Sequence, residues 1–444
     1  MERYKTADDY RLTQESDLHK AVAGDTTVVI DQFVKQVLDV CDGRTFSDIY
    51  AVLNKERCVT KTLLEATLNV LVYAGLVNTD KPVSVKKKRK ESLHKHNTPL
   101  VSIVILNFNG IRHLDELMKS VTNQDYTNLE IIVVDNGSTD GSIEFLCDSY
   151  PDVRIIPLLK NVGFARGNNV GIEAALGEFI FILNNDTVLD SDCISKLVTA
   201  AHSDIEAGAI AARMMFYDNP RFVNSFGNSV SPYTWGADNF IGYLDVGQFQ
   251  CLQPSFSACF GAALLRKKAI DSVGLLDPSF GFYYEDSDWC YRARLKGWRV
   301  IAAPDAIVYH KFSASMKEKP EYFKLSFAVR NRLKFAIKNL EMRNALWFTR
   351  NYVLREDVRN IARYLLHADW RGAALYFRAY VGLALGMPRL LWLRLLAQRT
   401  RIQSATDEML FQVNESIEAP QLIGSYPVIN LKNIRHYYMH TGIV

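Results

Sequence analysis

VSIVILN, residues 101–107, is a run of β-branched and apolar residues that ends at a polar turn. Similar apolar runs follow at 130–134, 153–157 and 179–183, and amphipathic stretches of helix length separate them. Short apolar strands that alternate with helices are typical of a mostly parallel sheet with helices on both faces. We therefore expect an α/β domain with such a sheet at residues 100–315.

The first two strands lead into polar turns, at the end of the sheet where ligands of parallel α/β sheets bind. Asn107 and Asn109 follow the first strand, and Asp135 opens the segment DNGSTDGS after the second. A carboxylate in this place is suited to accept hydrogen bonds from a nucleobase or ribose, and small residues let a helix N-terminus approach phosphate. The same segment, taken alone, is also compatible with a well-capped turn.

A glycine-rich segment, KNVGFARGNNVG at 160–171, follows the third strand. Its three glycines permit close backbone contact with a ligand, and Arg166 is suited to bind a polyanion. The segment matches neither GxGxxG nor GxxxxGK[ST]. The sequence therefore gives little support for a dinucleotide-dependent oxidoreductase or a P-loop nucleotidase.

The fourth strand ends abruptly at Asn184-Asn185-Asp186. Mg²⁺ and Mn²⁺ prefer oxygen ligands and are usually held by one or two carboxylates together with substrate phosphates. Asp186 is therefore the expected ligand of a divalent cation.

Five segments in this order resemble family 2 glycosyltransferases of the GT-A fold, closest to the rhamnosyltransferase-like branch: residues 101–109, 134–142, 161–168, 183–186 and 284–292. The resemblance implies a Rossmann-like sheet and an inverting glycosyltransferase (EC 2.4) that uses Mg²⁺ or Mn²⁺ and a UDP- or dTDP-linked sugar donor. The DxD motif of the family is replaced here by Asn184-Asn185-Asp186, so only Asp186 carries over as a metal ligand. Asn184 is expected to contact the ribose or to reach the metal through water.

The resemblance also assigns the remaining site residues. Asp286 matches the catalytic base, and an inverting transfer needs one carboxylate to remove the acceptor proton. The acidic cluster around it is otherwise compatible with simple N-terminal capping of a helix. His310 matches a late histidine that completes the metal site. The donor side is expected to comprise Asn107, Asn109, Asp135, Asn161, Gly163, Arg166, Asn168, Asn184 and Asn185, and the sugar and acceptor pocket Gly261, Tyr284, Glu285, Asp288, Trp289 and Arg292.

Residues 1–80 have the hydrophobic spacing of a small α+β unit and resemble the PqqD-like winged-helix family. The resemblance is carried by VVI at 28–30, LDVCDGRT at 38–45, Asp48-Ile49 and AGLV at 74–77. Members of that family bind short peptides by adding them to a sheet edge. The alternative is a packing domain without a ligand.

Two further regions bear on membrane contact. Residues 81–99 contain KKKRK and are expected to form a basic linker, either a solvated spacer or a contact with an anionic membrane. Residues 316–444 are expected to be helical. Their most apolar run, 373–397, is interrupted by three arginines and contains Pro388, which argues against a spanning helix. The pattern is compatible with helices that lie in the headgroup region of a membrane. It is equally compatible with helices that pack on the protein while their arginines extend to water.

Charge and cysteine content limit the partners and the compartment. The formal net charge of +3 gives no argument for nucleic-acid binding. The seven cysteines are scattered without a CxxC pair, and the first ten residues are polar. We therefore expect a cytoplasmic location, with peripheral membrane contact as an option.

The acceptor is expected to be a peptide or protein, with a polysaccharide or a lipid-linked glycan as the alternative. The first domain favours a peptide or protein acceptor, whereas the family branch and the basic helices favour a polysaccharide or a lipid-linked glycan. A rival hypothesis is a non-catalytic peptide- and nucleotide-binding protein, because Asn184 replaces the first acid of the metal motif.

Overall fold

The computed structural model describes most of the chain between residues 98 and 411 and parts of the first region. The described residues are 3–6, 11–15, 18–23, 26–30, 32–56, 64, 68, 71–72, 77–79, 98–230, 236–243, 245, 249, 251–311, 321–402, 405–411 and 423–424. The basic cluster of the expected linker, residues 86–90, lies outside them.

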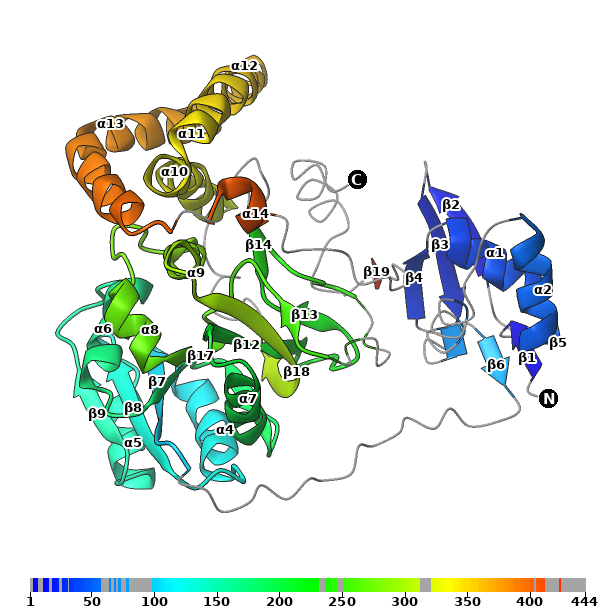
Figure 1. The fold of residues 1–444 in the computed structure, drawn as a ribbon, viewed down its shortest axis with the longest axis horizontal. Coiled ribbons are helices and arrows are strands. Elements are labelled where there is room, and N and C mark those ends of the chain that lie inside the picture. Colours follow the sequence, from blue (N-terminus) through cyan, green and yellow to red (C-terminus); the bar gives the residue numbers. More distant parts are fainter. Residues whose placement is uncertain are drawn as a thin grey trace.

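The centre of the molecule is a ten-stranded mixed sheet (Figure 1), whose main path has the order β11-β18-β12-β17-β10-β7-β8-β9. The strands β7, β8, β9 and β10 pair in parallel, as do β12 and β18, while β17 is antiparallel to both of its neighbours. Their bounds are Val101–Asn107 (β7), Leu129–Asp135 (β8), Arg154–Pro157 (β9), Phe179–Asn184 (β10), Thr187–Leu189 (β11), Ala207–Phe216 (β12), Ala262–Arg266 (β17) and Arg299–His310 (β18). The four strands expected from the apolar runs are confirmed.

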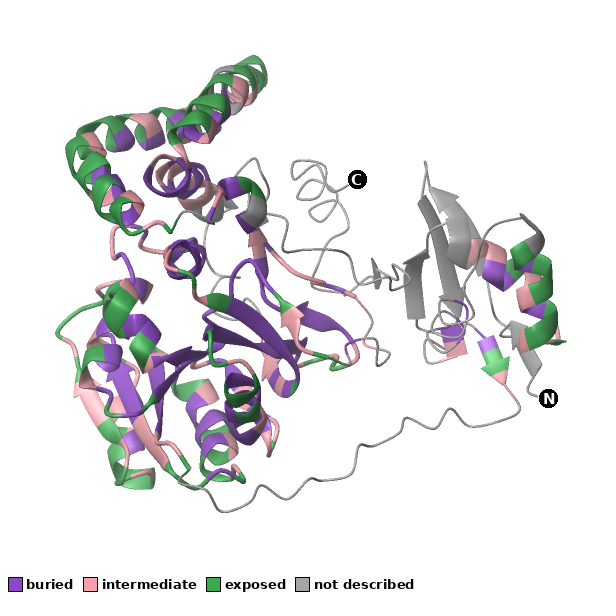
Figure 2. Ribbon diagram, in the orientation of Figure 1, coloured by how far each residue is buried: buried purple, intermediate pink, exposed green. Residues whose placement is uncertain are grey.

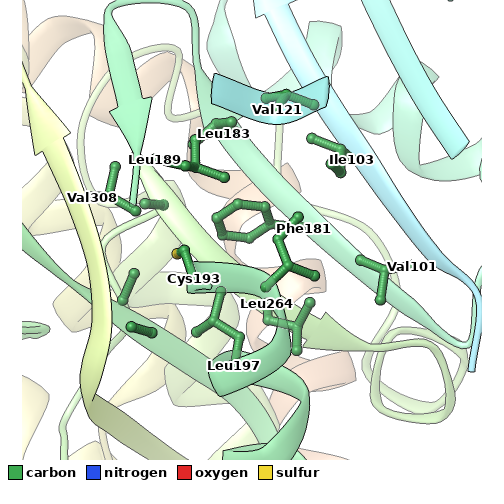
Figure 3. Close-up of a cluster of buried hydrophobic side chains, with 14 of the residues drawn as sticks. Val101, Ile103, Val121, Phe181, Leu183, Leu189, Cys193, Leu197, Leu264 and Val308 are labelled. Atoms are coloured by element: carbon green, nitrogen blue, oxygen red, sulfur yellow. The ribbon is translucent and has the colours of Figure 1, made fainter. Parts of the chain in front are cut away.

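Two hydrophobic cores lie on opposite faces of this sheet, because successive side chains of a strand point to opposite sides. Val101 and Ile103 of β7 contribute to the first core, shown in Figure 3, whereas Val104 contributes to the second. The first core is covered by α4 (Ile111–Thr122), α5 (Ser142–Ser149) and α7 (Cys193–Ser203), and the second by α6 (Phe164–Ala174), α8 (Lys267–Val273) and α9 (Glu285–Leu295). The expected GT-A type architecture, a sheet with helices on both faces, is confirmed.

The expected helical C-terminal region is present. It comprises α10 (Glu321–Asn339), α11 (Met342–Phe348), the π-helix η1 (Thr349–Asp357), α12 (Val358–Leu366), α13 (Trp370–Arg399) and α14 (Asp407–Phe411). The helix α10 packs against both α9 and α13. Lys338 at its end reaches into the α/β domain, where its Nζ lies 2.7 Å from Asp277 and 2.8 Å from Asp288.

The described parts of the first region form two small sheets and two helices. One sheet has the order β5-β1-β6 and the other β19-β4-β3-β2. The strands are Arg3–Thr6 (β1), Arg11–Glu15 (β2), Leu18–Ala23 (β3), Thr26–Ile30 (β4), Arg44–Thr45 (β5), Val77–Thr79 (β6) and Ile423–Gly424 (β19), and the helices Gln32–Val40 (α1) and Phe46–Glu56 (α2). The segment 74–76, which contributed to the winged-helix resemblance, lies outside the described residues.

Candidate functional site

A polar network lies at the carboxyl ends of β7, β8 and β10. Nδ2 of Asn107 donates to Asp135 at 3.0 Å, and Nδ2 of Asn185 donates to Oδ1 of Asn107 at 2.8 Å. The second carboxylate oxygen of Asp135 accepts hydrogen bonds from backbone N–H groups of its own turn, including that of Ser138 at 2.8 Å. The structure thus joins three side chains that the sequence predicted for the donor side.

Gly110 makes the close approach of these strands possible. A Cβ atom at this position would lie 2.2 Å from Nδ2 of Asn185 and 2.4 Å from Oδ1 of Asn107. Any side chain here would therefore push the network apart, a constraint that the sequence analysis missed.

Asn109 holds the first two loops together rather than only facing a ligand. It adopts a left-handed conformation with φ of 49°, its Oδ1 accepts from the backbone of Thr139 at 2.9 Å, and its own N–H donates to Ser138 at 2.9 Å. Asn tolerates this region better than most residues. Asn109 therefore ties the turn after β7 to the turn after β8.

The segment after β9 is attached to the same turns. Oδ1 of Asn161 accepts from Nδ2 of Asn136 at 3.1 Å and from the N–H of Gly163 at 2.9 Å. Arg166 is exposed in the first turn of α6, whereas Asn168 is fully buried, and its Oδ1 has no partner among the described residues. A buried carbonyl oxygen without a donor is the kind of group that a ligand can satisfy.

Asp186 and His310 form the candidate metal pair. Nε2 of His310 lies 3.2 Å from Oδ1 of Asp186, and both side chains are largely buried. Burial alone would lower the pKa of His310, but the charge and hydrogen bond of Asp186 reverse this, and the net pKa is raised. The pKa of Asp186 is lowered: burial opposes the shift and His310 causes it.

The second nitrogen of His310 is held by a residue that the sequence analysis did not identify. Nδ1 lies 2.7 Å from Oδ1 of Asn224, which orients the ring and directs Nε2 toward Asp186. A ligating histidine typically has its other nitrogen fixed in this way.

Within the described part of the chain, no group of three His, Cys, Asp or Glu side chains could hold a metal ion. A cation at the Asp186–His310 pair would need further ligands, and diphosphate oxygens are of the kind that Mg²⁺ and Mn²⁺ prefer.

Asn184 and Gly261 lie together beside this pair. The N–H of Asn184 donates to the carbonyl of Gly261 at 2.9 Å, and a Cβ on Gly261 would lie 3.3 Å from the Asn184 side-chain nitrogen. Asn184, predicted for the donor side, and Gly261, predicted for the acceptor pocket, are thus direct neighbours.

Asp286 lies at the start of α9 and is half-buried. Its Oδ2 accepts from Nδ2 of Asn228 at 2.7 Å, and its Oδ1 accepts from the N–H of Ser287 at 2.6 Å. Burial raises the pKa of Asp286 to about 6, despite these hydrogen bonds. Burial first, and the charge of Asp286 second, raise the pKa of the adjacent Glu285 well above its usual range. Asp286 is the less buried of the two acids and its carboxylate accepts two hydrogen bonds, which makes it the better candidate for the base.

Asp238 is a further acid at the site, and no sequence motif pointed to it. It lies on β15 (Gly236–Asp238), opposite Asn228 of β14 (Asn228–Val230). Burial first and the charge of Asp286 second raise its pKa to about 6, and the charge of His310 opposes the shift. The charges of the candidate base and of the metal pair therefore both act on Asp238.

The backbone before Asp286 is strained. Tyr283 and Tyr284 have φ angles of 66° and 73°, a region that L-residues with large side chains rarely adopt. Nδ2 of the fully buried Asn331, on α10, donates to the carbonyls of Phe282 at 2.7 Å and Tyr283 at 2.9 Å. The C-terminal region thus helps to hold the segment that carries Asp286.

Of the residues predicted for the acceptor pocket, Asp288 and Trp289 are fully buried and Arg292 is partly buried, and all three contact other parts of the protein. Asp288 is fully buried and binds Arg292 at 2.9 Å and Lys338 at 2.8 Å. Arg292 also donates to the carbonyls of Val273 and Leu275, and Trp289 is fully buried with its Nε1 donating to the Gly274 carbonyl at 2.8 Å. These side chains join α9 to its neighbours. Tyr284 is also buried, and its hydroxyl accepts from the N–H of Gly236 at 3.0 Å.

Comparison with known proteins shows what part of the α/β domain is similar to. Residues 102–274 match the model of glycosyl transferase family 2. An uncharacterized glycosyltransferase of Haemophilus influenzae is 34% identical over 106 residues, 23% of this chain and 33% of the relative. An N-acetylglucosaminyl-diphospho-decaprenol L-rhamnosyltransferase of Mycobacterium tuberculosis is 24% identical over 245 residues, 50% of this chain and 80% of the relative.

The chain thus spans about a third of the length of the Haemophilus relative. Among solved structures, GalNAc-T7 with UDP, GalNAc and Mn²⁺ has a TM-score of 0.47 and 15% identity, covering 57% of this chain and 50% of that one. The similarity to glycosyl transferase family 2 thus covers residues 102–274 of this chain.

Proposed function

We propose that the protein is an inverting glycosyltransferase that moves a sugar from a UDP- or dTDP-linked donor to an acceptor hydroxyl. The observation that carries the proposal is the half-buried carboxylate of Asp286, whose pKa is raised to about 6. The charge of Asp286 and the charge of His310, the partner of Asp186, both act on Asp238, so the base and the candidate metal pair share one electrostatic environment.

In the proposed reaction, Asp286 removes the proton of the acceptor hydroxyl while that oxygen forms a bond to the anomeric carbon. The bond between this carbon and the diphosphate oxygen breaks, and its electron pair leaves with the nucleoside diphosphate. Attack and departure on opposite faces invert the anomeric configuration. A divalent cation held by Asp186 and His310 would neutralise the charge that grows on the leaving diphosphate.

The rival, a non-catalytic nucleotide-binding protein, differs in one observable. The transferase releases nucleoside diphosphate when incubated with its sugar nucleotide and Mn²⁺, and chelation of the metal stops the release. A binding-only protein gains thermal stability from the nucleotide but releases no product. Screening UDP- and dTDP-sugars by both measurements tests the proposal.

The acceptor that we favour is a glycan on a lipid carrier. The support comes from the Mycobacterium relative, whose name specifies a decaprenyl-diphosphate-linked acceptor and which matches over 245 residues. A peptide is the second candidate, because β19 pairs with the edge of β4 (Ile423 with Val29), the mode of strand addition expected of a peptide-binding domain.

Transfer of a radiolabelled sugar to a polyprenyl-diphosphate sugar, the same free sugar or a peptide pool separates these acceptors. Label in the peptide pool alone would rule out the lipid-linked acceptor. We place the reaction in the cytoplasm, on account of the scattered cysteines.

Asp238→Asn is expected to shift the acid limb of the pH–rate profile to lower pH. The charges of Asp238 and Asp286 repel each other, so each raises the pKa of the other. The charge of Asp286 also acts on Glu285, Tyr284, Cys259 and Cys290, and burial raises the pKa of each of them. Without the charge at 238, Asp286 stays ionised at lower pH. Measuring kcat/KM from about pH 5 to 8 for both proteins checks this, and an identical acid limb would contradict it.

Asn331→Ala is expected to lower kcat by up to about 10²-fold, because misplacing a catalytic group by about 1 Å has effects of this size. The side chain contacts no donor-side residue. It donates to the carbonyls of Phe282 and Tyr283, in the strained segment before Asp286. The KM for the donor should therefore stay near that of the wild type. A rise in donor KM with an unchanged kcat would show that Asn331 does not position Asp286.

A further inference from the structure

The outer side of α13 carries an unusually apolar stripe. Trp370, Phe377 and Leu385 are 69%, 69% and 80% exposed, and Trp392 and Leu395 continue the series with 58% and 56%. Their spacings of 7, 8, 7 and 3 residues are near multiples of the helical repeat, so they share one side of the helix. We call these five residues the α13 stripe. Figure 2 shows the exposed outer side of this helix.

Arginines line one edge of the stripe, and no acid balances them. Arg371, Arg378 and Arg389 follow one another at spacings of 7 and 11 residues, which aligns them along the helix. The 30 residues of α13 contain five arginines and no aspartate or glutamate. An apolar stripe with a purely cationic edge is complementary to an anionic surface with an apolar interior.

The inner side of α13 is fixed to the protein. Tyr376 and Leu383 are buried, and Nη1 of Arg394 donates to the carbonyls of Ile337 at 2.6 Å and Leu340 at 2.7 Å. The helix is long and apolar enough to cross a bilayer, and 22% of its most apolar window is buried. Because its inner side packs along α10, it cannot cross a bilayer without carrying α10 with it.

From these observations we propose that the α13 stripe lies in the interface of a membrane that contains anionic lipids, with the arginines at the phosphate level. Interfacial helices combine an apolar face of Trp, Phe and Leu with basic residues in this way. A second copy of the chain is disfavoured as occupant, since it would place two arginine edges together. The inference goes beyond sugar transfer and does not depend on it.

The test is flotation of the full-length protein with vesicles of phosphatidylcholine, alone or mixed with equal parts of phosphatidylglycerol. We expect binding to the anionic vesicles only, weakened by salt. Leu385→Glu/Trp392→Glu should lose this binding by at least about tenfold, because each substitution replaces an apolar contact by a charge repelled by the lipid. Both positions are exposed, so the melting temperature should not change.

The matched control is Leu159→Glu/Leu176→Glu, which changes two exposed leucines of the α/β domain by the same charge. It should bind as the wild type does. Arg378→Gln/Arg389→Gln should reduce binding at low salt and make it less sensitive to salt.

Equal binding by the stripe variant and its control, or no binding to anionic vesicles at low salt, overturns the proposal. The proposal is also overturned if the wild type is a dimer and the stripe variant is a monomer. That result would identify a second copy of the chain as the occupant of the stripe. Donor hydrolysis in solution should be the same in all these proteins, which separates this test from that of the transferase activity.

Discussion

Asp286→Asn is expected to lower kcat by about 10²–10⁴-fold, the range that a general base contributes. The amide keeps the shape of the carboxylate but cannot accept the acceptor proton. Donor affinity should change little, because the donor-side network of Asn107, Asp135 and Asn185 is formed by other elements. Single-turnover transfer and donor titration, measured on the same preparation, check both expectations.

The variant should be at least as stable as the wild type near neutral pH. The folded-state pKa of Asp286, about 6, lies above its ordinary value of 3.8, so the folded protein holds this proton more tightly than the unfolded chain. The ionised carboxylate therefore costs stability as the pH rises through this window, and asparagine removes that cost. Glu285→Gln is the matched control, because it makes the same change at the adjacent buried acid, which is not assigned as the base, and it should retain most of the activity. Full activity in Asp286→Asn would refute the assignment of the base.

The sequence predicted the strands of the sheet and the side chains at their ends because both are local features. Each apolar run that became a strand is bounded by a polar turn, so the ends of β7, β8 and β10 were set by the pattern itself. Parallel strands then bring Asn107, Asp135 and Asn185 to one edge without further information.

The residues that the sequence missed depend on tertiary pairing. Asp238 reaches the site because it lies opposite Asn228 in a hairpin, and Asn331 because α10 docks against the segment before α9. Neither residue belongs to a motif. Only the packed structure distinguishes them from the many other Asn and Asp residues.

Proximity in sequence was misleading on α9. Asp288 follows Asp286 by two residues, and because a helix turns about 100° per residue, it points to the opposite side of α9. Trp289, three residues after Asp286, is fully buried and donates to the Gly274 carbonyl. Asp286 meets Asn228, whereas Asp288 meets Lys338 of α10. Asp288 therefore joins α9 to α10. Of the predicted pocket residues, Gly261 lies beside Asn184 and Glu285 next to the base.

Asp186→Asn is expected to lower kcat by about 10²–10³-fold, the effect of removing one group that stabilises charge in a transition state. Its loss leaves His310 as the one remaining side chain of the pair, and a cation held by the pair would neutralise the charge that grows on the leaving diphosphate. Excess Mn²⁺ should not restore the rate. Mn²⁺ binding followed by electron paramagnetic resonance should weaken in parallel.

Asn224→Ala provides the contrast that identifies the metal pair. Asn224 contacts Nδ1 of His310 at 2.7 Å but does not touch Asp186, so its removal frees the ring without removing a ligand. Loss of such a supporting contact typically costs about 10–100-fold in metal affinity. Saturating Mn²⁺ should therefore rescue Asn224→Ala but not Asp186→Asn. Equal rescue of both variants would mean that Asp186 does not bind the cation.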